Sequence, residues 1–222
     1  MRRQLAWIAA LALAGLGPAR ADTILHLSDT ETVMAHPDEL VATLRAEAVA
    51  SSAAAAQQAV NATMAAALAR AKQAAGITAA TQGYTAWQAT QPQRWQASQT
   101  LVLRSHDGPP LLTLAGELQQ HGLAISDLSW QLSPAASRAA HDAALREALS
   151  ALRGRAEDAA GLLGLRFEQF QRVSIATPQP VPFAPRVMMS AALAAAPTPP
   201  SAEAQDVPVS ATADADALLL MK

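Results

Sequence analysis

The chain has 222 residues, of which 51% are hydrophobic, 4% aromatic and 15% charged, and about a quarter are Ala. This length allows one domain of ordinary size or two small ones, and the composition is not that of a disordered chain. The formal net charge of −2 excludes the strongly basic surface that nucleic-acid binding needs. The absence of Cys excludes disulfides, thiolate metal sites and cysteine nucleophiles together.

The first 21 residues have the three parts of a secretory signal peptide. Two Arg residues follow Met1, an apolar run covers residues 5–16, and the small side chains of Ala19 and Ala21 fit a cleavage site. The apolar run is shorter than the roughly 20 residues that span a bilayer. We therefore predict cleavage after Ala21, a mature chain that begins at Asp22, and a periplasmic or secreted protein with no transmembrane segment after cleavage.

Alternation of apolar and polar residues predicts two strands at the start of the mature chain. They cover residues 23–34 and 40–48, and Pro37-Asp38 marks the turn between them. A helix is predicted over residues 49–75, because small and apolar residues recur there every three or four positions and Gly76 follows as a stop. Its expected buried stripe is Ala56, Val60, Met64, Leu68, Ala71 and Ala75.

A hairpin, a short helix and a further strand are predicted next. The hairpin pairs residues 78–90 with a return strand over residues 95–103, and a turn at residues 91–93 joins them. The short helix opens at Asp107 and ends at Gly122. Residues 125–132 then alternate as a strand with one apolar face.

A third helix begins after Ser133, whose hydroxyl is a suitable cap, with Pro134 at the first helical position. Gly164 ends this helix, and residues 165–175 return as a strand. The periodicity predicts that the helix buries a stripe made of Leu145, Leu149, Leu152, Ala156, Ala159 and Leu163.

The last part of the chain contains a segment rich in Pro and Ala and a final strand. Prolines recur through residues 177–206, which we expect to be an extended, mobile loop. Residues 207–222 resume a strand that returns to the domain of residues 22–176 or to a neighbouring subunit. The predicted class is α+β, with antiparallel sheets, Ala-rich helices on one face, and the order strand, strand, helix, strand, strand, helix, strand, helix, strand, loop, strand.

Several tracts together resemble a known family. They are Pro37-Asp38 with the strand after it, the helix core of residues 61–68, the hairpin around Tyr84 and Trp87, and the tracts at residues 97–101, 125–133, 160–165 and 209–212. In order and spacing they are similar to the SIMPL-domain family of exported bacterial proteins, which includes periplasmic oxidative-stress-defence proteins and periplasmic immunogenic proteins. The resemblance implies a fold and a compartment, but no set of catalytic residues.

The polar residues form no pattern typical of an active site or a metal site. The segment His36-Pro37-Asp38-Glu39 is typical of a turn. The serines lack a nucleophile elbow, and Gly161-Leu162-Leu163-Gly164 lacks the Lys of a phosphate-binding loop. We therefore predict no catalytic residue, no metal and no cofactor. The histidines lie in different elements without metal-ligating spacing: His26, His36, His106, His121 and His141.

Two aromatic residues are candidates for contact with a ligand or a partner. Tyr84 and Trp87 lie on opposite faces of one predicted hairpin strand. Aromatic side chains at such places more often pack against their own protein, and we expect that role here.

These observations lead to one functional hypothesis and two alternatives. The first is an exported, non-enzymatic protein that acts in cell-envelope or oxidative-stress defence through contacts with an envelope protein partner and as a homo-oligomer. The second is a periplasmic module that binds a small apolar ligand or a peptide between the sheet and the helices, and the third is a hydrolase. Because residues 218–221 are apolar and end a strand expected at a sheet edge, we expect the segment 207–222 to be buried and to contribute to the oligomer.

Overall fold

The computed structural model describes residues 22–90, 93–176 and 202–222. The expected signal peptide of residues 1–21 and most of the expected Pro-rich loop, residues 177–201, lie outside these ranges. The strands are β1 (Thr23–Ala35), β2 (Glu39–Ala50), β3 (Thr78–Thr90), β4 (Gln93–Ser105), β5 (Leu123–Gln131), β6 (Leu165–Ile175) and β7 (Val207–Met221), and the helices are α1 (Ala53–Ala71), α2 (Gly108–Gln120) and α3 (Pro134–Leu162).

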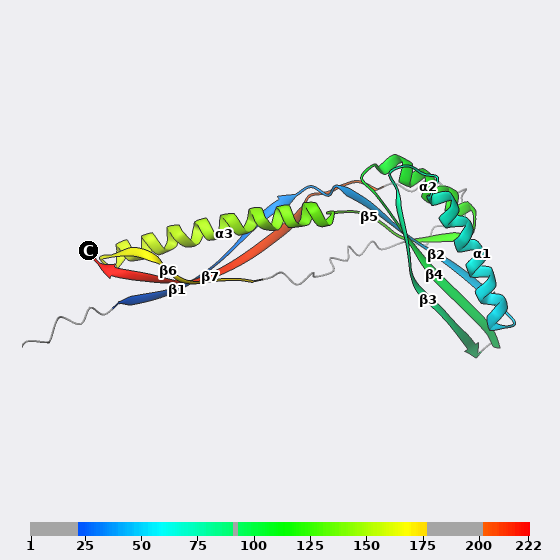
Figure 1. Cartoon of the computed structure of the whole chain (residues 1–222), viewed down its shortest axis with the longest axis horizontal. Helices are drawn as coiled ribbons and strands as arrows, with labels where there is room; N and C mark the ends of the chain where they lie inside the picture. Colours follow the sequence, from blue (N-terminus) through cyan, green and yellow to red (C-terminus); the bar gives the residue numbers. More distant parts are fainter. Residues whose placement is uncertain (1–21, 91–92, 177–201) are drawn as a thin grey trace, which may run out of the picture. The chain divides into compact units, whose positions relative to one another are not determined.

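The fold class is α+β, and the order of the elements is the predicted one (Figure 1). The chain divides into two compact units. The four-stranded unit comprises residues 32–144 and the described part of residues 179–210, and the three-stranded unit comprises the described parts of residues 1–31, 145–178 and 211–222. The predicted domain of residues 22–176 therefore contributes to both units.

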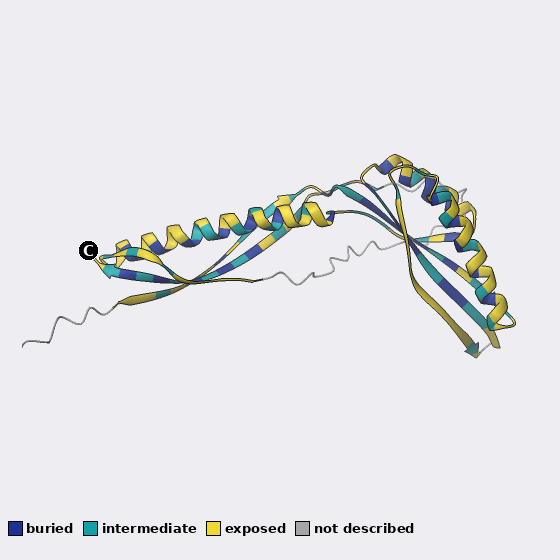
Figure 2. Cartoon of the chain, in the orientation of Figure 1, coloured by how far each residue is buried: buried dark blue, intermediate teal, exposed yellow. Residues whose placement is uncertain are grey.

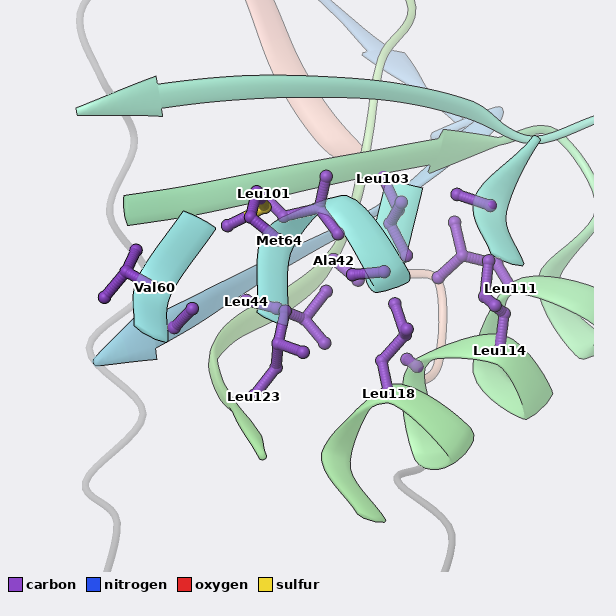
Figure 3. Packing of buried hydrophobic residues seen from close by; sticks show 14 of the residues in the cluster. Ala42, Leu44, Val60, Met64, Leu101, Leu103, Leu111, Leu114, Leu118 and Leu123 are labelled. Atoms are coloured by element: carbon purple, nitrogen blue, oxygen red, sulfur yellow. The ribbon is translucent and has the colours of Figure 1, made fainter. Parts of the chain in front are cut away.

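The four-stranded unit has the strand order β3-β4-β2-β5, with antiparallel neighbours. Helices α1 and α2 cover one face of this sheet (Figure 1). Leu40, Leu44, Leu101 and Leu103 point from β2 and β4 into the layer between sheet and helices and are fully buried. Val60 and Met64 of α1 and Leu111, Leu114 and Leu118 of α2 fill this layer from the other side (Figure 3).

Helix α1 is shorter than predicted at both ends. The strand β2 continues to Ala50, and Ser52 then caps the helix by accepting a hydrogen bond from the Ala55 amide at 3.2 Å. The predicted stripe is confirmed at Ala56, Val60, Met64 and Ala71, which are buried, and at Leu68, which packs against the same core, but Ala75 lies beyond the helix and is exposed.

The three-stranded unit has the order β1-β7-β6, so β7 is the central strand. Side-chain hydrogen bonds link β1 with β7 between His26 and Asp216 and between Thr30 and Thr212. In an antiparallel pair, the numbers of opposite residues add up to a constant. The two residue numbers give the same sum in both pairs, so both pairs belong to one antiparallel register. In the four-stranded unit, Thr32 with Ser210 continues the same register.

The position of β7 corrects the expectation that this strand lies at a sheet edge. It pairs with β1 and β6 of its own chain. Its inward positions carry small alanines that let α3 lie close, while its outward positions are polar as far as Asp216 and are then Leu218 and Leu220. Leu219 is buried as expected, but Met221 is exposed. The strand therefore offers no free edge to a second copy.

Helix α3 buries a stripe that shares only Leu152 and Ala156 with the predicted one. The buried residues follow one another every fourth position and are almost all small: Ala140, Ala144, Ala148, Leu152, Ala156 and Ala160. In the three-stranded unit they face Ala213, Ala215 and Ala217 of β7. Leu145 and Leu149 lie at the flanks of this contact, and Leu163 is exposed. A helix can approach a sheet this closely only where both surfaces lack large side chains, so Ala rather than Leu marks the line of contact.

Candidate functional site

The five histidines lie in or next to several different elements, from β1 to α3. Most bind a single nearby group: His26 Nδ1 donates to Asp216 at 2.7 Å, His36 Nδ1 donates to Asp206 at 2.8 Å, and His121 Nε2 accepts from Arg70 at 2.9 Å. The buried Nδ1 of His141 has no hydrogen-bond partner among the described residues. In that same part of the chain, no three His, Asp or Glu side chains gather as metal ligands would.

Asp38, Ser133 and His106 form a cluster of the residue types found in hydrolases. The Ser133 hydroxyl donates to Asp38 Oδ2 at 2.8 Å and accepts from the Ala136 amide at 3.1 Å, while the Ser133 amide donates to Asp38 Oδ1 at 2.7 Å. His106 Nδ1 donates to the carbonyl oxygen of Asp38 at 2.6 Å rather than to the serine hydroxyl.

This geometry is that of a helix cap. The Ser133 residue is buried, and its oxygen satisfies the first turn of α3, as the sequence predicts. The hydrogen bond from the Ser133 amide, with the one from its hydroxyl, lowers the pKa of the Asp38 carboxyl and keeps it ionised. An ionised aspartate on the hydroxyl holds it in place but leaves it without the imidazole base that a serine nucleophile needs. The sequence shows both residues, but not that the fold pairs them.

A second polar network lies on the face of the four-stranded sheet that is turned away from the helices. Arg45 of β2 donates to Ser98 of β4 at 3.0 Å, and Ser98 shares a hydrogen bond of 2.9 Å with Thr85 of β3. Arg104 of β4 donates to Glu39 of β2 at 2.9 Å. These bonds join neighbouring strands side to side, so they fix the sheet.

The outermost strand β3 is the most unusual surface in this unit. It is 13 residues long, and every residue except Ala89 is exposed (Figure 2). Tyr84 and Trp87 are 42% and 40% exposed, which is more than the packing role expected for them implies. Thr85 reaches Ser98 on the face away from the helices, and Trp87, two positions along, lies on that same face.

The four sheet edges differ in charge. The edge strands β1, β5 and β6 each carry charged side chains, for example Glu31, Asp127 and Arg172, whereas β3 has none. Charged side chains and bulges are the usual protection of an edge against pairing with another strand. The composition of residues 78–90 shows this lack of charge, but the order of the strands, which makes the segment an edge, is not readable from the sequence.

One irregularity interrupts β3. Its register with β4 shifts between Gln82 and Thr85, so that Gly83 and Tyr84 together face one residue of β4. Gly83 has a φ of +62°, which other residues adopt only with strain. Such a bulge bends a strand locally and leaves regular stretches on either side of it.

Comparison with known protein families places the chain in one of them. Residues 25–216 match the family described as SIMPL, protein of unknown function (DUF541). The match covers most of the chain, so the protein belongs to the SIMPL family, as the sequence tracts predict. A search of the curated proteins finds no match. None of the helices in the described ranges is long and apolar enough to cross a membrane.

Proposed function

We propose that this protein is exported and acts without catalysis, in cell-envelope or oxidative-stress defence, through protein–protein contacts and self-assembly. The observation that carries the proposal is the edge strand β3, which presents an exposed, uncharged row of backbone groups to other chains. The signal-peptide pattern of residues 1–21 supports export, and the resemblance to periplasmic stress-defence proteins supports the process.

The polar clusters support a role without catalysis. The serine with a neighbouring aspartate and histidine caps α3, and the arginines on the sheet face bind neighbouring strands. Each of these groups makes a hydrogen bond that holds the fold.

The alternative, a pocket for a small apolar ligand between sheet and helices, has less support. In the four-stranded unit this layer is occupied by buried Leu, Ala, Val and Met side chains (Figure 3). A peptide ligand is the stronger form of this alternative, because an extended peptide would add to the same edge strand as a partner protein does.

Two measurements test the proposal. Sedimentation velocity of the mature protein at micromolar concentration should give a single species heavier than a monomer. A strain lacking the gene should lose survival under peroxide and regain it with the intact gene. A monodisperse monomer contradicts self-assembly, and unchanged survival contradicts the defence role. A rise in melting temperature with a peptide, on a monomer, would favour the alternative instead.

A further inference from the structure

We propose that two copies of this chain join through β3, edge to edge and antiparallel, to form one continuous sheet across a two-fold axis. The inference rests on the self-assembly proposed above and names the surface that performs it. The free side of an edge strand is a row of backbone N–H and C=O groups. Only another extended backbone can form hydrogen bonds with all of them.

The charge distribution selects a second copy as the occupant. In a two-fold pairing the same strand lies on both sides of the axis, so a charged residue near the axis meets its own like charge. The strand β6 would bring Arg172 into this position, and β1 would bring Glu31. β3 has no charged residue over its whole length, so it pairs with itself without repulsion.

The bulge limits the pairing to one stretch of the strand. Beyond Gly83 and Tyr84, residues 85–90 continue in regular register with β4. Residues that lie opposite each other in an antiparallel pair point to the same face. The helices of both copies lie on one face of the joined sheet only if odd-numbered residues pair with odd-numbered residues of the second copy. Even-numbered residues then pair with even-numbered ones.

The register that best covers exposed apolar surface centres on Trp87. The two indoles then lie next to each other on the face away from the helices, where each is now 40% exposed. On that same face, Thr85 lies opposite Ala89 of the second copy, and on the face of the helices the small Ala86 lies opposite the long Gln88. On both sides of the central Trp87 pair, a small Ala thus meets a larger residue.

Disulfide trapping tests this register directly, because the chain has no Cys of its own. We expect A86C mixed with Q88C to form a mixed disulfide under mild oxidation much faster than either variant forms one with itself. The Cα atoms of opposite residues lie about 4.5–5.5 Å apart, which a disulfide can bridge. The two copies of one variant place their Cys residues diagonally, two positions apart along the strand, which is too far for an unstrained disulfide. The matched control is A124C, which places Cys on the other edge of the same sheet, in β5, and should stay unlinked.

A charge variant gives the second readout. Q88K places Lys near the axis and should lower the assembly by at least tenfold in association constant, while Q120K, at an equally exposed Gln of α2, should leave it unchanged. Circular dichroism of both variants checks that they fold.

The outcomes separate the two proposals. An oligomer that persists in Q88K and gives no mixed disulfide overturns the β3 interface but leaves self-assembly standing. A wild-type protein that is monomeric at tens of micromolar overturns both.

Discussion

The two units bury their helices with different side chains. In the four-stranded unit, large residues such as Leu44, Leu101 and Leu118 fill the layer between sheet and helices. In the three-stranded unit, the contact between α3 and β7 is mostly Ala against Ala, with Leu152 and Leu219 as the larger buried residues. The four-stranded unit thus gains stability from the large apolar area that it buries. The three-stranded unit gains stability from the close packing of α3 against β7.

This difference predicts different tolerance to substitution. A fully buried Leu contributes about 1.5–3 kcal/mol by transfer from water, whereas an Ala contributes a small fraction of this. An Ala contact, on the other hand, has no room for a larger side chain. The four-stranded unit should therefore be sensitive to truncation, and the three-stranded unit to enlargement.

The largest effect is expected from removal of residues 207–222. Because β7 is the central strand of the three-stranded sheet, β1 and β6 lose their only common partner and α3 loses the surface that it covers. The deletion should leave the four-stranded core folded and the other unit open, with aggregation as the result. Hydrogen exchange by mass spectrometry reports protection in each unit. Retained protection of β6 would contradict the central role of β7.

Truncation of Leu101 should have the next largest effect. This side chain is fully buried in the four-stranded core, so L101A should lower the free energy of unfolding by about 2–5 kcal/mol. The matched control is L162A, because Leu162 is 90% exposed and its truncation should cost almost nothing. Urea unfolding of both variants measures the difference. Equal losses would show that burial does not decide the effect.

Enlargement of Ala156 tests the close contact of α3. The residue is fully buried next to Ala217, so A156L should destabilise the three-stranded unit by about 1–3 kcal/mol through overpacking. The control A139L adds the same side chain at an exposed position of the same helix and should be neutral. Thermal unfolding followed by circular dichroism compares them. If A156L is as stable as the wild type, the Ala contact is not the limit on helix approach.

The smallest effect concerns the pH dependence of the cap on α3. The pKa of Asp38 lies below its ordinary value of 3.8, because the Ser133 amide and hydroxyl donate hydrogen bonds to the carboxylate. A lowered pKa gives stability that is complete above the ordinary pKa and is lost as pH falls through the lowered one. The gap in unfolding free energy between wild type and D38N should therefore narrow below pH 3.8. Unfolding curves at several pH values would show it, and a constant gap would argue against the cap.

Local patterns in the sequence predict most of the fold. Alternation predicts β2 and the hairpin of β3 and β4, and cap residues place the start of α3 at Pro134. The buried stripe of α3 is predicted correctly only at Leu152 and Ala156, because the choice between Leu and Ala depends on the surface opposite, which belongs to a strand far along the chain.

The candidate site is harder to predict from the sequence, because it too depends on contacts between distant parts of the chain. The lack of charge in residues 78–90 is visible, but only the strand order makes that segment an edge. The link between Asp38 and Ser133 joins residues 95 positions apart, and no local rule connects them.

The central place of β7 also sets the order in which the chain can fold. His26 and Asp216 are 190 positions apart, so joining β1 to β7 costs about 4 kcal/mol more loop-closure entropy than closing a short hairpin. Contacts of low contact order, such as the β3–β4 hairpin, form first, and the four-stranded sheet with α1 and α2 can form before residues 207–221 are synthesised. β1 and β6 have no strand to pair with until β7 has been synthesised. The three-stranded unit therefore forms last, whereas the four-stranded sheet needs no strand from the end of the chain.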